Sequence, residues 1–187
     1  MTAAVLLIGA PGAGTTSVLE KLATLLEIDG VGFGALEAEQ LAWGSPWLGG
    51  EMWLAQVRAV LELQRGAGRR LFLIAATTET NRELTDLIDA IAVDVVAIVL
   101  LVASADLVAD RLSEREPDSW PGKRALIARA RELAESLPAL DGVDLRVLTE
   151  NRAPEEVALE VRDGLEQLGI AGRGSAPACE KSRPVLN

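Results

Sequence analysis

A glycine-rich segment near the start of the chain carries the clearest chemical signal. Residues 9–16 read GAPGAGTT, which matches the phosphate-binding pattern G-x-x-x-x-G-K-[ST] at every position except one. Its glycines let the backbone turn tightly, so that successive N–H groups can point at one phosphate group. The hydroxyl of Thr16 occupies the position that binds Mg²⁺. The segment therefore predicts a site for the phosphates of ATP, or another nucleoside triphosphate, with Mg²⁺.

The departure from the pattern is Thr15, which stands where the pattern has lysine. Lysine would bring a full positive charge to the β- and γ-phosphates, whereas threonine offers only a hydroxyl. A chance glycine turn is the alternative interpretation, but an apolar segment precedes the loop and an amphipathic one follows it, as the pattern requires. The candidate nucleotide-binding residues of this loop are Gly9, Gly12, Ala13, Gly14, Thr15, Thr16 and Ser17.

Short apolar segments alternate with segments of helical periodicity along most of the chain. The apolar runs are too continuous for strands with one exposed face, and they predict strands buried on both faces. Such buried strands are expected at residues 3–8, 70–76 and 95–102, a weaker strand containing Gly32 and Gly34 at residues 31–37, and a last strand at residues 143–148. Helices are expected at residues 15–27, 51–65, 81–91, 105–115, 124–137 and 154–168. The alternation predicts an α/β fold of three layers, with a five-stranded parallel sheet between helices.

Length and composition predict one domain over residues 1–170, followed by a disordered tail at residues 171–187 that is rich in Gly, Pro, Ser and charge. Cys179 is the only cysteine, and the chain has no histidine. A disulfide framework, a thiolate zinc site and histidine-dependent catalysis are therefore excluded. Proton transfer would have to use Asp, Glu, Lys or water.

The net charge of −10 makes nucleic acid a poor partner, because an acidic chain repels a phosphate backbone. No apolar run approaches the ~18 residues of a membrane span, and no basic region precedes the first apolar run. We therefore expect a cytoplasmic protein with no membrane partner.

Three parts of the chain together resemble the small P-loop kinases. They are residues 9–16, the apolar strand before Ser104, and the segment DLVADRLSER at residues 106–115. This family includes the nucleoside-monophosphate kinases, such as adenylate kinase, and the gluconate, shikimate and adenylylsulfate kinases. The resemblance covers roughly residues 3–168 and implies the sheet order 2-3-1-4-5. Archaeal-type cytidylate kinases have threonine at the lysine position, so the resemblance implies that Thr15 is compatible with activity.

The resemblance also implies roles for residues on the nucleotide side of the site. In these kinases an arginine pair at the positions of Arg111 and Arg115 stacks on adenine and reaches the phosphates, which suits the planar guanidinium. The alternative is ordinary surface charge on a helix. Asn151, after the last expected strand, would line the adenine pocket. The polar segment REPDSWPGK corresponds to a mobile lid. Its last residue, Lys123, and the residue after it, Arg124, are catalytic candidates that could replace the missing loop lysine. The alternative for both is a solvated helix.

The acceptor side of the site is expected after the second and third strands. Glu37 and Glu39 follow the second strand, and Glu39 is the candidate base for an acceptor hydroxyl. Trp43 and Trp47 would form a pocket wall, although anchoring the loop to the core or a homodimer contact are equal alternatives. By the resemblance, Arg82 would hold an anionic group of the acceptor; pairing with a nearby acid is the alternative.

A metal-steering aspartate that often ends the third strand in these kinases is missing. The sequence there is AATTE, in which Glu79 is the first acid. Three hypotheses remain: a kinase that transfers the γ-phosphoryl group of ATP to a small-molecule acceptor, a non-catalytic nucleotide sensor or regulatory subunit, and a structural protein that has lost nucleotide binding. The absent lysine and the absent aspartate favour the second, and the arginines favour the first.

Overall fold

Five parallel strands form the centre of the molecule. The computed structural model describes residues 1–170; the predicted disordered tail at residues 171–187, with Cys179, lies outside the described residues. The strands are β1 (Ala3–Gly9), β2 (Gly34–Glu37), β3 (Leu71–Ala76), β4 (Val95–Val102) and β5 (Leu145–Leu148). Their order is β2-β3-β1-β4-β5, with every neighbouring pair parallel, which confirms the predicted fold class and strand order.

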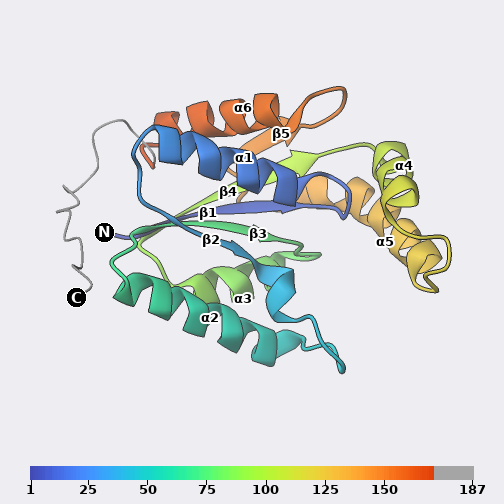
Figure 1. The fold of residues 1–187 in the computed structure, drawn as a ribbon, viewed down its shortest axis with the longest axis horizontal. Helices are drawn as coiled ribbons and strands as arrows, with labels where there is room; N and C mark the ends of the chain where they lie inside the picture. Colours follow the sequence, from blue (N-terminus) through green and yellow to red (C-terminus); the bar gives the residue numbers. More distant parts are fainter. Residues whose placement is uncertain (171–187) are drawn as a thin grey trace, which may run out of the picture.

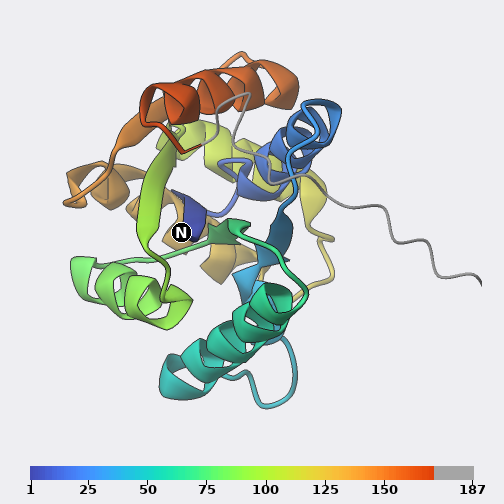
Figure 2. The ribbon, with the colours of Figure 1, turned by 90° about the vertical axis from the view of Figure 1, so that its left-hand side faces the viewer.

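Helices cover both faces of this sheet. They are α1 (Thr15–Ile28), α2 (Gly50–Gly66), α3 (Asn81–Ile91), α4 (Ala105–Arg115), α5 (Lys123–Ser136) and α6 (Pro154–Gln167), with short 3₁₀ helices η1 (Ala38–Leu41) and η2 (Leu137–Ala139). Figure 1 shows α1 and α6 on one face, α2 and α3 on the other, and α4 with α5 beside the carboxyl ends of the strands. Figure 2 shows the same three layers from the end at which β1 begins. No helix in residues 1–170 is long and apolar enough to cross a membrane.

The central strands are apolar throughout because helices cover both of their faces. All six residues of β3 are buried, and so are Ala4–Ile8 of β1. The largest fully buried side chains include Phe72, Leu6 and Ile8. This core fixes the carboxyl ends of β1, β2 and β3 side by side, and loops and helices that carry polar residues follow each of these ends.

Two helix starts have the side-chain caps that their sequences indicate. The Thr80 hydroxyl accepts a hydrogen bond from the Glu83 amide at 3.2 Å, and the Ser104 hydroxyl accepts one from the Leu107 amide at 3.4 Å. The Glu83 carboxylate does not complete a reciprocal box with Thr80. It accepts instead from the amide of Glu79 at 2.7 Å, which holds the loop between β3 and α3.

Candidate active site

The loop between β1 and α1 has the backbone shape of a phosphate cradle. Gly12 and Gly14 have φ angles of 88° and 98°, a left-handed conformation that residues with a Cβ rarely adopt. A Cβ added at Gly12 would lie 2.9 Å from the carbonyl oxygen of Val108 in α4, so α4 leaves no room for a side chain there. The sequence of the loop is therefore required by its turn and by its contact with α4.

The start of α1 leaves backbone donors available to an anion. Gly14 precedes the helix and provides no side-chain cap. Among the described residues, none accepts a hydrogen bond from the amides of Thr15, Thr16 or Ser17. Such amides, together with the positive end of the helix dipole, are the groups that bind phosphate at helix N-termini. The residues present therefore fit a nucleotide phosphate.

Thr15 brings no charge to this cradle. Its side chain is half-buried, and its methyl group faces Gly9, since a Cβ added at Gly9 would lie 3.2 Å from Thr15 Cγ2. Arg111 of α4 supplies the one basic side chain in the described chain that hydrogen-bonds to the loop. Its guanidinium donates to the Gly12 carbonyl at 3.0 Å and to the Thr149 carbonyl at 3.2 Å. Arg111 thus joins the loop to the end of β5.

The other two residues predicted for adenine binding are Asn151 and Arg115. Asn151 is exposed, follows Thr149 by two positions and has a φ of 54°. Arg115, one turn after Arg111 on α4, is bonded to Glu116 at 2.7 Å. Arg111 therefore reaches the loop and Arg115 does not; binding of adenine by these residues stays a prediction.

An acid lies beside the expected metal position, although it comes from β2 rather than β3. The Thr16 hydroxyl donates to the Glu37 carboxylate at 3.1 Å. A hydroxyl group that donates its hydrogen bond to a carboxylate has its lone pairs directed away from that carboxylate, where they can bind a cation. Thr16 and Glu37 therefore fit Mg²⁺. Glu37 does not line the cavity described next.

A cavity of about 450 Å³ opens where β3, η1, α2 and α3 meet. This volume is suitable for a small organic molecule. Its lining combines carboxylates with tryptophan, leucine and threonine. The lining residues are Glu39, Ala42, Trp47, Leu48, Gly49, Gly50, Trp53, Leu54, Thr77, Thr78, Glu79, Glu83 and Asp86.

Glu39 connects this cavity with the phosphate loop. It lies in η1, an element that the sequence did not predict, and its carboxylate accepts a hydrogen bond from the backbone N–H of Thr77. The Thr77 hydroxyl in turn lies 3.5 Å from the carbonyl oxygen of Gly9, where the loop begins. Burial raises the pKa of Glu39, and the nearby charge of Glu37 raises it further. The candidate base is therefore at the border of the two sites.

The structure separates the residues predicted for the acceptor. Trp47 lines the cavity, whereas Trp43 is 77% exposed and lies outside the lining. The Arg82 side chain is 91% exposed and 3.8 Å from Asp86, and it is not part of the lining either. Its role with an anionic acceptor stays a prediction.

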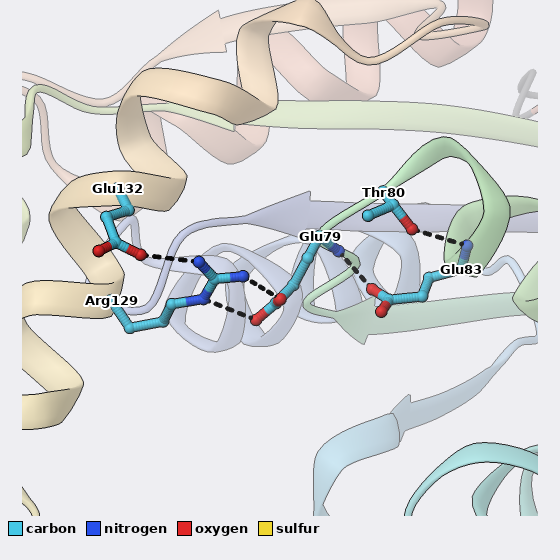
Figure 3. A network of polar contacts seen from close by, with 5 residues as sticks. All are labelled: Glu79, Thr80, Glu83, Arg129 and Glu132. Carbon is cyan, nitrogen blue, oxygen red and sulfur yellow. Dashed lines mark hydrogen bonds and ion pairs between the residues drawn. The ribbon is translucent and has the colours of Figure 1, made fainter.

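Glu79 is held by an arginine of α5. Figure 3 shows Arg129 bonded to both carboxylate oxygens of Glu79 and to Glu132. The Glu83 carboxylate accepts a hydrogen bond from the amide of Glu79. The hydrogen bonds with the two glutamates raise the pKa of Arg129. The negative charge of Glu79 is thus compensated by Arg129.

Within residues 1–170, no three or more side chains of His, Cys, Asp or Glu are placed together so that they could hold a metal ion.

Solved structures share this arrangement of loop and sheet, although no protein-family model and no curated protein matches the chain. A sugar kinase from Janibacter sp. has a TM-score of 0.65 at 17% identity, over 91% of this chain and 96% of that one. A gluconokinase from Sinorhizobium meliloti has a TM-score of 0.64 at 20% identity, over 89% of this chain and 93% of that one. The structure of an APS kinase from Mycobacterium tuberculosis was solved in complex with AMPPNP and APS. It has a TM-score of 0.61 at 20% identity, over 88% of this chain and 98% of that one. The chain has the fold of the P-loop small-molecule kinases.

Within this kinase fold, the predicted cation Lys123 is committed to α4. Its ammonium donates at 2.7 Å to the carbonyl oxygens of Ser113 and Glu116 and to the carboxylate of Asp118. The side chain is only 14% exposed. All three donors are used, so in this conformation Lys123 caps the C-terminus of α4 instead of offering charge to a phosphate. Arg124 is exposed and makes no side-chain hydrogen bond or ion pair within the described chain.

We predict that Lys123→Met lowers the free energy of unfolding by about 1–2 kcal/mol, because two helix-end carbonyl groups lose a charged donor. Arg124→Met is the matched control and should stay within about 0.5 kcal/mol of the unchanged protein. Urea unfolding measures both values. A stable Lys123→Met protein with impaired nucleotide turnover would instead favour the lid role.

Several lining residues were not recognised as functional from the sequence. Nothing in the sequence pattern marks Trp53, whose indole N–H donates to the Ala38 carbonyl at 2.7 Å. The same holds for Thr78, Glu83 and Asp86. Their shared signal is position: they lie just after β3 or in the first turns of α2 and α3, beside the strand ends.

Proposed function

We propose that the chain is an ATP-dependent kinase that phosphorylates a hydroxyl group of a small molecule. The observation that carries this proposal is the contact between the two sites. Glu39 and Thr77 line the cavity, and Thr77 lies 3.5 Å from the first residue of the phosphate loop. An acceptor in the cavity would therefore lie next to the phosphates of a nucleotide on the loop, and phosphoryl transfer depends chiefly on such positioning.

The nucleotide would be held by the backbone at the start of α1. The amides of residues 15–17 and the helix dipole would bind the β- and γ-phosphates. Mg²⁺, when bound at Thr16 with Glu37 behind it, would neutralise charge on the phosphates. The Arg111 guanidinium donates a hydrogen bond to the Gly12 carbonyl oxygen, which holds Gly12 in place, and it adds a positive charge next to the loop.

Glu39 would act as the general base. The acceptor hydroxyl oxygen would form a bond to the γ-phosphorus while the bond from that phosphorus to the β–γ bridging oxygen breaks, and ADP would leave. The hydroxyl proton would pass to the Glu39 carboxylate. The raised pKa of Glu39 makes its carboxylate a stronger base than an exposed glutamate. Transfer would be direct, with no covalent enzyme intermediate.

A nucleotide sensor is the second candidate function, and one observation favours it. Lys123, one of the two lid cations predicted to replace the loop lysine, is occupied by the end of α4, and Arg129 of α5 is occupied by Glu79. Without a mobile cation the site could bind nucleotide and release it unchanged.

Thermal unfolding with ATP and Mg²⁺ tests nucleotide binding. At ~100 times the dissociation constant, a ligand that binds only the folded protein stabilises it by about 2.7 kcal/mol, and the melting temperature should rise. Thr16→Val should remove the part of the shift that depends on Mg²⁺. Thr24→Val, which removes an exposed hydroxyl from the same helix, should not.

The outcomes separate the two candidate functions. No shift with any nucleoside triphosphate would contradict both of them. A shift accompanied by ADP formation with an acceptor supports the kinase. A shift with no ADP formation across a broad panel of hydroxyl compounds supports the sensor.

A further inference from the structure

The cavity that we assign to the acceptor is acidic. Its carboxylates come from Glu39, Glu79, Glu83 and Asp86, and no lysine or arginine of the described chain lines it. An anionic acceptor would have to enter without a basic partner. The charge of the lining therefore opposes hydroxy acids, sulfates and phosphates as acceptors.

The four carboxylates differ in how far they are neutralised. Arg129 compensates Glu79 directly. Asp86 has only Arg82 at 3.8 Å, and that exposed pair contributes little. Glu39 and Glu83 accept hydrogen bonds from the amides of Thr77 and Glu79 and make no ion pair with a described residue. Negative charge therefore remains at this site.

The other wall of the cavity is apolar and aromatic. Trp47 and Trp53 line it together with Leu48 and Leu54. The hydrogen bond from the Trp53 indole to the Ala38 carbonyl fixes that ring in place. An indole face attracts a cation as well as an apolar group, and the attraction is strongest for tryptophan. This wall suits an apolar or aromatic portion next to a positive charge.

The lining also contains a buried polar group. Thr78 lines the cavity and is 1% exposed, and its hydroxyl has no hydrogen-bond partner among the described residues. Buried polar side chains in folded proteins are usually hydrogen-bonded. A polar group of a molecule in the cavity would satisfy this hydroxyl.

We propose that the acceptor is a hydroxyl compound with a protonated amine and an apolar or aromatic portion. The amine lies toward Glu83 and Asp86, the apolar portion lies against Trp47 and Trp53, and the hydroxyl lies toward Glu39. This inference rests on the proposed function, since it assigns a substrate class to the same cavity.

Three probes of similar shape but different charge test the inference. Phenylalaninol carries a positive charge, the corresponding phenyl-substituted diol is neutral, and phenyllactate carries a negative charge. Titrations of the full chain, followed by tryptophan fluorescence without nucleotide, should give a dissociation constant for phenylalaninol about tenfold or more below that for phenyllactate, with the diol between them. Equal binding, tighter binding of phenyllactate, or no binding of phenylalaninol would overturn the inference.

Paired variants locate the charge that matters. The double variant Glu83→Gln and Asp86→Asn should bring the phenylalaninol and phenyllactate constants to within about threefold of each other. Asp89→Asn is the control, because it removes one exposed charge from the same helix outside the lining. If the double variant still binds phenylalaninol as much more tightly than phenyllactate as the unchanged protein does, the amine site is not at these carboxylates and the inference fails.

Measurements of ADP formation distinguish a wrong acceptor class from a wrong proposed function. A protein that phosphorylates hydroxy acids faster than amino alcohols is a kinase with a different acceptor class. A protein that binds phenylalaninol selectively, yet forms no ADP with any amino alcohol, has the acidic site but lacks the proposed activity.

Discussion

Glu39→Gln should lower kcat about 10²–10⁴-fold while the nucleotide dissociation constant changes less than about twofold. The carboxylate is the only group of η1 that contacts the Thr77 amide and lines the acceptor cavity. Glutamine has the same shape, and its carbonyl oxygen can still accept from Thr77, so the backbone should hold. What glutamine removes is the ability to take a proton. Steady-state kinetics with the best acceptor found and isothermal titration with ATP measure the two quantities.

A pH profile gives this variant a second readout. The base acts in its ionised form, so the rate of the unchanged protein should fall as the pH drops through the raised pKa of Glu39. The residual rate of Glu39→Gln should lack that fall. Glu62→Gln, which removes an exposed acid from α2, is the control and should behave as the unchanged protein. An unaltered kcat in Glu39→Gln would exclude Glu39 as the base.

Thr15→Lys should tighten ATP binding by roughly tenfold to a hundredfold, because a charged donor at the phosphates contributes about 1.5–3 kcal/mol. Thr15 stands at the lysine position of the loop, and the amides of residues 15–17 have no described partner. The new ammonium would therefore meet the same phosphates as the backbone. Isothermal titration with ATP and Mg²⁺ measures the change in affinity.

Thr24→Lys is the matched control for this charge. It adds the same group to an exposed position of the same helix, nine residues later. At about 1.5 Å of rise per residue it lies beyond the Debye length at physiological salt, so ATP affinity should be unchanged. An equal response of the two variants, or none from Thr15→Lys, would show that Thr15 is not at the phosphates. Tighter binding without turnover would favour the sensor.

The sequence was sufficient to predict the sheet, because burial on both faces leaves a direct pattern. Residues 95–102 contain eight apolar residues in succession and form β4 without any change of boundary. The caps at Thr80 and Ser104 act over three residues, so the local sequence indicates where α3 and α4 begin. The loop before α1 was recognised from its glycines, whose positive φ angles few other residues adopt.

The site was less predictable because its residues are brought together by tertiary structure. Lys123 looks like a free lid cation in the sequence, yet the end of α4 lies against it and uses all its donors. Trp53 and Glu83 belong to helices separated by β3, and nothing local indicates that they face one cavity. Glu37 was expected near the acceptor, whereas it is hydrogen-bonded to Thr16 and lies outside the lining of the cavity.

The ion pair between Arg129 and Glu79 links the charge of the cavity lining to the position of α5. Arg129 belongs to α5, whereas the carboxylate that it neutralises belongs to the wall of the cavity. A displacement of α5 away from β3 would separate the pair and add a negative charge to the lining without changing any residue of the cavity. The cavity would then attract a cation more strongly than in the form described here.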